Sequence, residues 1–300
     1  MALSMTRDER KTPLEAWVLM APALAILAVI TFYPLLRTLY FSFTDAQISA
    51  AGTSGNFVGF DNYAYAASDA GFHAALIRTI VFTVSSVALE TVMGVAVALL
   101  LNQEFKGRAI ARTAIILPWA VPNIVNAMMW RLIMNPEYGA LNAALTQTGI
   151  LGAYRSWLGD PSTALAMVIF ADVWKNFPLV AFVALAALQT VPSELYEAAR
   201  IDGAGPWSRF RFVTLPGIVA PLLVAIVLRS IEAFRVFDII YVMTRGGPID
   251  STKTVSFYVY QTYFSYLDAG TGAAYAVIVA LLSAVMISGY ILVIRRQEAK

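Results

Sequence analysis

Apolar residues dominate six stretches of the 300-residue chain, and polar segments separate them. A helix needs about 20 residues to cross a bilayer, because each residue adds about 1.5 Å to its length. All six stretches reach that length, so the pattern predicts six transmembrane helices. They cover residues 14–36, 79–101, 113–133, 163–188, 215–238 and 273–294. The predicted fold class is all-α, a polytopic membrane protein in which residues 1–300 form one transmembrane domain.

Prolines stand near the start of two predicted spans. Pro118 and Pro122 fall in the third, and Pro216 and Pro221 fall in the fifth. A proline lacks the backbone N–H and frees a carbonyl of the preceding turn. Neighbouring helices can satisfy such a carbonyl inside a membrane, so we expect both spans to continue through their prolines.

The composition agrees with a membrane protein. Hydrophobic residues make up 59% of the chain and charged residues only 13%, whereas a soluble domain has about 25% charged residues. The net charge of +2 is too small for a nucleic-acid-binding basic patch. Cysteine is absent and His73 is the only histidine, which excludes disulfides and any zinc site built from several such ligands. We therefore expect no bound metal and no nucleic-acid partner.

Lysine and arginine gather on one side of the predicted membrane domain. That side carries Arg7, Arg10, Lys11, Lys106, Arg108, Arg112, Arg200, Arg209, Arg211, Arg295, Arg296 and Lys300. The opposite loops carry Arg131, Arg155, Arg245 and Lys253. By the positive-inside rule both termini are cytoplasmic. The first span is too long for a signal peptide and lacks a clear small-residue cleavage site, so we expect it to remain as an anchor.

The cytoplasmic loop 190–214 is predicted to form two short helices. Ser193 can cap the first, which would end at Gly203, a residue able to adopt a left-handed conformation. Pro206 suits the first turn of the second helix, which leads into the fifth span. The sequence "EAA" at 197–199 offers a carboxylate beside two small residues that let another backbone come close. The alternative is a solvated amphipathic loop without a partner.

The spacing in this loop resembles the conserved loop of ABC-importer permeases. "EAA" is followed by three residues, Gly203, nine residues and then "VTLP" at 213–216, where the family usually has isoleucine in place of Val213. Other stretches resemble the sugar-importing branch. They are "FVGFDNY" at 57–63, "RTAIILPWAVP" at 112–122, "NPEYGALN" at 135–142 and "GGP" at 246–248. The six-span form is similar to the smaller permease of maltose importers.

The resemblance implies a type I ABC importer permease in the plasma membrane of a bacterium. Its partners would be a second homologous permease, two copies of an ATPase subunit, an extracytoplasmic sugar-binding protein or lipoprotein, and membrane lipid. The solute would be trehalose or a similar disaccharide. The chain has no G-x-x-x-x-G-K-[ST] phosphate loop, so ATP and Mg would bind the partner ATPase, and this chain would bind no cofactor. The expected coupling residues are Glu197, Ala198, Ala199, Asp202, Gly203 and Pro216.

Ionisable residues within the predicted spans are the next candidates, because charge is expensive inside a membrane and usually faces a bundle interior or cavity. They are Glu90, Asp172, Lys175, Arg229, Glu232 and Arg235. Asp172 and Lys175 are i,i+3 neighbours and are expected to pair. One interpretation is that these charges pair between helices and fix the packing. The other is that some of them line a translocation path.

A sugar path needs amides or carboxylates beside aromatic rings. The candidates are Asn123, Asn126, Trp130, Trp174, Asn176 and Glu232. Alternatively, Trp119 and Trp130 belong to an interfacial aromatic belt, and Asn123 and Asn126 bond across helices. The small residues Ser86, Gly94 and Ala98 share a face with Glu90 and indicate close helix packing.

The outer segments 44–77 and 239–272 are candidate docking sites for the external binding protein. Residues 44–77 contain Asn56, Asp61, Asn62 and Tyr63 and no lysine or arginine before Arg78. The alternative for the Gly- and Ser-rich residues 49–55 is a disordered loop.

Three other functions compete with sugar import. The first is a homodimeric ABC permease for another solute, such as an amino acid or phosphate. The second is an intramembrane transferase, which should gather carboxylates or histidines at one membrane face, whereas the charges here are dispersed. The third is a secondary transporter, which should show repeated halves and unwound spans; the sequence has no convincing internal repeat.

Overall fold

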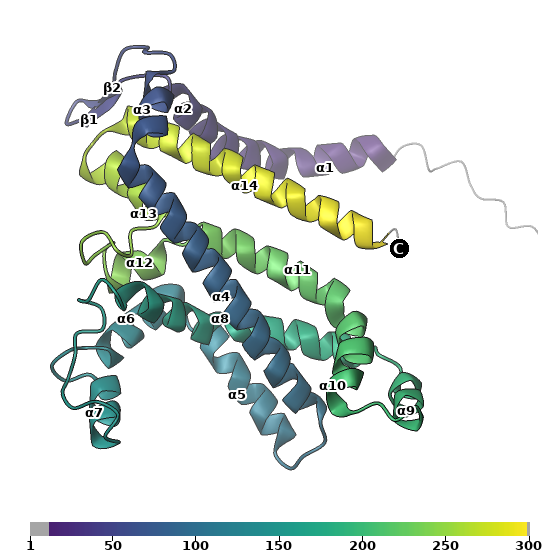
Figure 1. The fold of residues 1–300 in the computed structure, drawn as a ribbon. Coiled ribbons are helices and arrows are strands. Elements are labelled where there is room, and N and C mark those ends of the chain that lie inside the picture. The colour runs from purple at the N-terminus through teal and green to yellow at the C-terminus, as the bar shows by residue number, and fades with distance from the viewer. Residues whose placement is uncertain (1–11, 299–300) are drawn as a thin grey trace, which may run out of the picture. The chain divides into compact units, whose positions relative to one another are not determined.

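The computed structural model describes residues 12–298 (Figure 1). They divide into two compact units, residues 12–68 with 262–278 and residues 69–261 with 279–298. Helices form nearly all of both units, which confirms the predicted all-α class. Of the charged residues behind the predicted orientation, Arg7, Arg10, Lys11 and Lys300 lie outside the described residues.

The first unit starts with a continuous helical stretch and continues into a small hairpin. In chain order its elements are α1 (Thr12–Leu27), the π-helical turn η1 (Ala28–Phe32), α2 (Tyr33–Phe41), β1 (Gln47–Ser49), β2 (Gly52–Ser54) and α3 (Asp61–Ser68). The strands pair antiparallel, with Ile48 opposite Thr53. The segment for which a disordered loop was the alternative therefore forms an ordered hairpin.

The second unit contains the remaining short and long helices. They are α4 (Ala70–Asn102), α5 (Arg108–Ala120), α6 (Asn123–Ile133), α7 (Ala140–Gln147), α8 (Ala164–Leu188), α9 (Ser193–Ile201), α10 (Pro206–Arg209), η2 (Phe210–Thr214), α11 (Leu215–Phe234), α12 (Asp238–Met243) and α13 (Val255–Tyr260). η3 (Gln261–Ser265) and α14 (Ala269–Glu298) each belong partly to both units.

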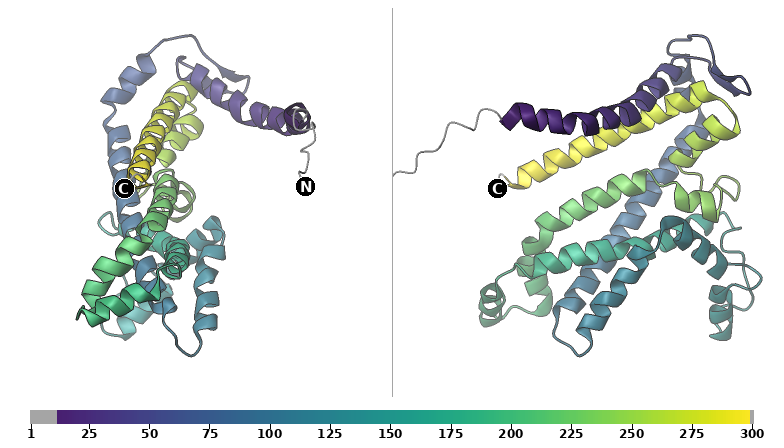
Figure 2. Two further views of the ribbon diagram at one scale, coloured as in Figure 1. Left: turned by 90° about the vertical axis from the view of Figure 1, so that its right-hand side faces the viewer. Right: turned by 180° about the vertical axis from the view of Figure 1, so that it is seen from behind.

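The long helices α4 and α8 of the second unit pack closely at a stripe of small residues. A Cβ atom on Gly94 would lie 2.7 Å from the Cβ atom of Val180, so only glycine permits this approach. Ser86 and Ala98 on the same face of α4 are fully buried. The packing role predicted for this stripe is confirmed. α11 packs against both helices, and α4 runs across α8 and α11, which lie side by side (Figures 1 and 2).

Among residues 12–298, five helical stretches are long and apolar enough to cross a membrane. They are Ala16–Phe41, Ala70–Asn102, Ala164–Leu188, Pro206–Phe234 and Ala269–Leu292. These stretches correspond to five of the six predicted spans. The fifth predicted span ends at Phe234 and not at 238, and the second begins at Ala70 and not at 79.

The third predicted span is broken, so the expectation of a continuous helix over 113–133 was wrong. α5 and α6 together are long enough to form one span, but they are bent by 96° (Figure 2). Val121 between them is extended, with φ −71° and ψ 129°. A residue before proline is pushed out of the helical region, and Pro122 cannot donate to the preceding turn. The chain therefore leaves the helix at Val121 and starts a new one at Asn123.

Candidate functional site

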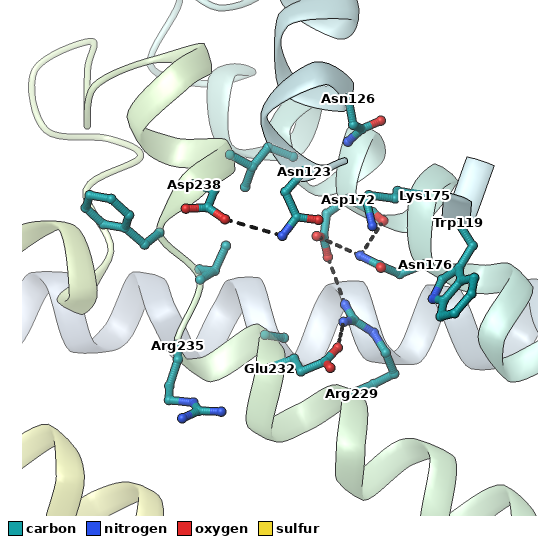
Figure 3. A pocket seen from close by; sticks show the side chains of 14 residues that line it. Trp119, Asn123, Asn126, Asp172, Lys175, Asn176, Arg229, Glu232, Arg235 and Asp238 are labelled. Carbon is teal, nitrogen blue, oxygen red and sulfur yellow. Dashed lines mark hydrogen bonds and ion pairs between the residues drawn. The ribbon is translucent and has the colours of Figure 1, made fainter. Parts of the chain in front are cut away.

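A cavity of about 560 Å³ lies within the second unit (Figure 3). Residues from α5, α6, α8, α11, the start of α12 and the segment between α11 and α12 line it. They are Trp119, Asn123, Asn126, Asp172, Lys175, Asn176, Arg229, Glu232, Ala233, Arg235, Val236, Phe237, Asp238 and Ile239. Most of the side chains are polar or charged although the helices are apolar, so the cavity gathers the intramembrane polar residues singled out in the sequence.

The guanidinium of Arg229 holds carboxylates from three helices at one edge of this cavity. Its Nε and Nη2 atoms donate to the two oxygens of Glu90 on α4, at 2.8 and 3.0 Å. Nη2 also donates to Asp172 Oδ2 on α8 at 3.3 Å, and Nη1 donates to Glu232 Oε2 on α11. We call Arg229, Glu90 and Asp172 the charge clasp.

Burial explains why the charge clasp needs so many contacts. Glu90 has no exposed surface, and the side chain of Arg229 is 5% exposed. An unpaired charge at such a depth is strongly unfavourable, but the five N–H donors of a guanidinium can satisfy several carboxylate oxygens at once. Glu232 differs, because 61% of its side chain is exposed and it faces the cavity. The interpretation that these charges pair between helices is therefore correct for Glu90, Asp172 and Arg229, and two of the three also line the cavity.

Two of the expected charge interactions are not formed. Within residues 12–298, Asp172 pairs with Arg229 and makes no ion pair with Lys175, its i,i+3 neighbour. The close approach of α11 places a better-matched guanidinium beside Asp172 than the flexible lysine chain on its own helix. Arg235 also makes no ion pair in this part of the chain, because α11 ends at Phe234 and the helical spacing from Glu232 is lost.

The three candidate asparagines all reach the cavity. Asn123 Nδ2 donates to Asp238 Oδ2 at 3.3 Å, and Asn126 Nδ2 donates to the carbonyl of Ala171 at 3.2 Å. Asn176 Nδ2 donates to both the carbonyl and Oδ1 of Asp172, at 3.0 and 2.9 Å. Asn123 and Asn126 thus bond across helices, as the packing interpretation predicted, whereas Asn176 bonds within α8. All three also line the cavity, as the path interpretation predicted.

Trp119 lines the cavity, whereas the path candidates Trp130 and Trp174 do not. Trp130 and Trp174 do not line the cavity, because their rings pack edge to face at 5.6 Å and Trp130 also packs on Phe170. Trp119, which had been considered as a membrane-interface residue, lines it. The bend after α5 accounts for the difference, since Trp119 and Trp130 belong to two helices of different direction.

Asp238 is a cavity residue that the sequence reasoning missed. It lies three residues after Arg235 and continues the period of three formed by Arg229, Glu232 and Arg235. That repeat was the available signal. The apolar pattern places position 238 at the end of the fifth predicted span, whereas α11 ends at Phe234 and Asp238 begins α12.

The loop at 190–214 forms the predicted pair of short helices. Gly203 has φ +77°, and the N–H of Ala204 donates to the carbonyl of Ala199 at 2.8 Å, which closes α9 with a left-handed residue. Pro206 begins α10, also as predicted. Ser193 does not cap α9, because the helix already begins at Ser193 and Pro192 occupies the capping position.

The loop exposes apolar and acidic side chains. None of the residues of α9 is buried, and Ile201 and Trp207 are 87% and 70% exposed. Glu197, Ala198 and Asp202 are exposed as well, and Ala199 is half-buried. Pro216 lines a second cavity of about 370 Å³ where the loop meets α11. The Tyr196 hydroxyl lies 3.1 Å from Thr214 Oγ1 and ties α9 to η2.

Polar residues of the outer segment 44–77 serve the first unit's own structure. Asn62 Nδ2 donates to the carbonyls of Ser42 and Thr44, at 3.0 and 2.8 Å, and the Tyr63 hydroxyl bonds to Ser42 Oγ. The backbone N–H of Asn56 donates to Asp45 Oδ1. Asp61 lies in the first turn of α3. Phe57 and Phe60 are 74% and 73% exposed, so the outward surface of this segment is aromatic.

The loop between α7 and α8 is held by a fully satisfied asparagine. Asn142 Nδ2 donates to the carbonyls of Asn135 and Arg155, and its Oδ1 accepts from Trp157 Nε1 at 2.8 Å. Nearby, hydrogen bonds from the side chain and backbone of Ser162 hold the pKa of Asp160 below its ordinary value, and Arg155 lies 3.2 Å from the same carboxylate. Within the described residues, no three His, Cys, Asp or Glu side chains come close enough together to hold a metal ion.

Comparison with known proteins gives one family. Residues 90–298 match the family described as binding-protein-dependent transport system inner membrane component. The chain is 38% identical to the trehalose/maltose transport system permease protein MalF of Thermococcus litoralis, over 89% of this chain and 88% of that protein. It is 36% identical to the sulfoquinovosyl glycerol transport system permease protein SmoG of Agrobacterium fabrum, over 95% and 92%. It is 32% identical to the trehalose transport system permease protein SugA of Mycobacterium tuberculosis, over 88% and 83%.

The fold also has solved counterparts. A chain from the crystal structure of a bacterial ABC transporter involved in the import of the acidic polysaccharide alginate superposes with a TM-score of 0.82. The likeness covers 96% of this chain and 97% of that chain at 22% identity, so it concerns the fold alone.

Proposed function

Because this chain belongs to the family of binding-protein-dependent transport system inner membrane components, we propose that it forms one half of the membrane channel of an ATP-driven sugar importer. It has the fold of a type I ABC importer permease and is a transport component, not an enzyme. The cavity of the second unit is then the part of the sugar path that this chain contributes.

Sugar is the solute class because three relatives of moderate identity are permeases for sugars or a sugar glycoside. Two of their names include trehalose, and we propose trehalose or a similar disaccharide as the solute. A non-sugar solute is the alternative. The cavity favours a sugar, since amides and carboxylates can bond hydroxyl groups while Trp119 and Phe237 offer ring faces.

The single observation that carries a transport role is the cavity itself. It places three asparagines and several charges among helices that are otherwise apolar. Polar and charged groups in such a position are expensive, and those that face a cavity commonly mark the path of a hydrophilic solute. An alternating exposure of this cavity to the outside and the inside would move the solute.

The loop at 190–214 is proposed to contact the ATPase. Its exposed Ile201 and Trp207 beside Glu197 form a mixed apolar and acidic surface of the kind found in protein interfaces. ATP and Mg would bind that partner, of which two copies would serve this chain and a second, homologous permease. An external sugar-binding protein would dock on the outer segments 44–77 and 239–272. Both termini would be cytoplasmic in a bacterial plasma membrane, with lipid around the apolar helices.

The test replaces Asn123, Asn126 and Asn176 together with alanine in the complete importer. Each lost neutral hydrogen bond costs about 0.5–1.5 kcal/mol, so uptake of labelled trehalose and substrate-stimulated ATP hydrolysis should fall at least tenfold. Asn102→Ala, at an exposed position outside the cavity, is the matched control and should behave as the parent. Parental uptake by the triple variant would remove the cavity from the path. Purification without an ATPase subunit would point to a secondary transporter instead.

A further inference from the structure

The amide of Asn176 is fixed in one orientation by its partners. Its Nδ2 lies within bonding distance of the carbonyl oxygen and Oδ1 of Asp172, and Figure 3 shows the amide nitrogen turned toward that carboxylate. A backbone carbonyl cannot donate a hydrogen bond, so the group that faces it must be the NH₂ end of the amide. Both N–H groups of Asn176 are therefore used within the protein.

The remaining oxygen of Asn176 is left for the cavity. Asn176 lines the cavity, and no donor among the described residues bonds to its Oδ1. Only 9% of the surface of Asn176 is exposed, so the amide cannot turn freely in solvent. An asparagine that could rotate would offer either a donor or an acceptor, whereas this one offers an acceptor only.

The orientation of the Asn176 amide depends on a chain of bonded residues that leads from the cavity wall to α4. Asp172 accepts from Asn176 through Oδ1 and from Arg229 through Oδ2, so its two oxygens are shared between the amide and the guanidinium. Arg229 is in turn held by both oxygens of the fully buried Glu90. The charge clasp thus connects α4, which contributes no cavity residue, to the amide at the cavity wall.

We propose that Asn176 is a specificity-determining residue that accepts a hydrogen bond from a solute hydroxyl. Asp172, which Arg229 holds within the charge clasp, is the residue that positions it. The inference rests on the proposed function in that it names the chemistry by which the same cavity selects its solute. The position next to Asn176 requires an O–H or N–H donor on the solute. A group that only accepts, such as an ether oxygen, a fluorine or a carboxylate, is rejected there, because it would leave a buried acceptor unpaired.

The first measurement tests the orientation without any sugar. Asn176→Asp puts carboxylate oxygens against the oxygens of Asp172 in place of the NH₂ group. We expect a lower thermal unfolding temperature of the complete importer, with partial recovery in the double variant Asp172→Asn and Asn176→Asp, whose new amide can donate to the new carboxylate. Asp160→Asn, at a half-buried aspartate outside the cavity, should not give this recovery. An Asn176→Asp importer as stable as its parent would overturn the orientation and with it the inference.

The second measurement tests the selection. Vesicles containing the complete importer are supplied with trehalose or maltose and with analogues in which single hydroxyls are replaced by fluorine, which keeps the size but cannot donate. At one hydroxyl position the parent should take up the fluorinated analogue about tenfold more slowly. Asp172→Asn and Asn176→Leu should each reduce that preference to about twofold, and Asp160→Asn should keep it.

The two proposals fail in different ways. A full preference for the hydroxyl in the Asp172→Asn and Asn176→Leu importers would overturn this inference while leaving sugar import intact. If the parent takes up neither trehalose nor maltose, the proposed substrate class fails, and the unfolding measurement still decides the orientation of Asn176.

Discussion

Arg229 is the residue on which the charged interior of the second unit depends. It is the shared partner of Glu90 and Asp172, and all three lie where water reaches little of the side chain. Removing one member of a buried ion pair leaves the other charge uncompensated, which typically costs about 3–5 kcal/mol. Replacing both members by apolar residues of similar size often restores much of that loss.

We therefore expect Arg229→Met alone to lower the thermal unfolding temperature of the importer sharply, because it leaves both Glu90 and Asp172 unpaired, whereas Glu90→Leu should lower it less, because Arg229 keeps Asp172. The double variant should be more stable than Arg229→Met, although its transport should stay impaired because Asp172 still lacks its partner. Differential scanning calorimetry of the purified complex measures the unfolding temperature, and uptake into vesicles measures transport. Additive losses in the double variant would contradict the pairing of these two residues.

At the scale of the element, the loop at 190–214 combines a fixed geometry with an exposed surface. Gly203 holds a positive φ with open space around its Cβ position, so the demand on this residue comes from the backbone and not from crowding. Asparagine tolerates the left-handed region, whereas a β-branched residue does not. The direction of α9 relative to α10 depends on that single residue.

Gly203→Val should abolish ATP-driven uptake, whereas Gly203→Asn should retain most of it. Glu197→Lys should have a similar effect, by reversing the charge at the proposed ATPase contact. Neither residue lines the cavity of the second unit, so binding of trehalose to the proposed external partner should not change. Uptake, ATP hydrolysis and co-purification of the ATPase are measured together. Parental coupling and assembly in both Gly203→Val and Glu197→Lys would show that the loop does not transmit the ATPase movement.

At the scale of the whole molecule, the sequence predicts opposite sides of the membrane for the outer segment 44–77 and the coupling loop. The chain contains no cysteine, so single cysteines can be placed without removing native ones. Ser49 is exposed at the end of β1, and Ser208 is half-buried in α10. Both positions therefore suit labelling from solution.

Ser49→Cys should react with an impermeant maleimide in intact cells, whereas Ser208→Cys should react only after the membrane is permeabilised. The reason is the excess of lysine and arginine on the side that contains Ser208. The cysteine-free parent gives the background. The reverse labelling pattern would overturn the orientation and the proposed ATPase contact together.

The pattern of the sequence by itself determined the helical class, five of the spans and the form of the coupling loop. These features follow from local rules. About 20 apolar residues are enough for a span, and a glycine followed by proline three residues later is enough to end α9 and begin α10. The period of three from Arg229 to Asp238 was also visible, although its last member was missed.

Only the tertiary structure decided which polar residues meet. Asp172 was expected to pair along its own helix and instead bonds to Arg229 from α11, and Glu90 joins them from α4. Trp130 packs against Trp174, and Trp119 lines the cavity, because the break at Pro122 reorients α6 relative to α5. Helical periodicity fixes the face on which a side chain lies, but the crossing of separate helices fixes its partner. The hydrogen bonds that orient Asn176 lie within α8, but the carboxylate of Asp172 that receives one of them is held by Arg229 from α11, which in turn bonds Glu90 from α4.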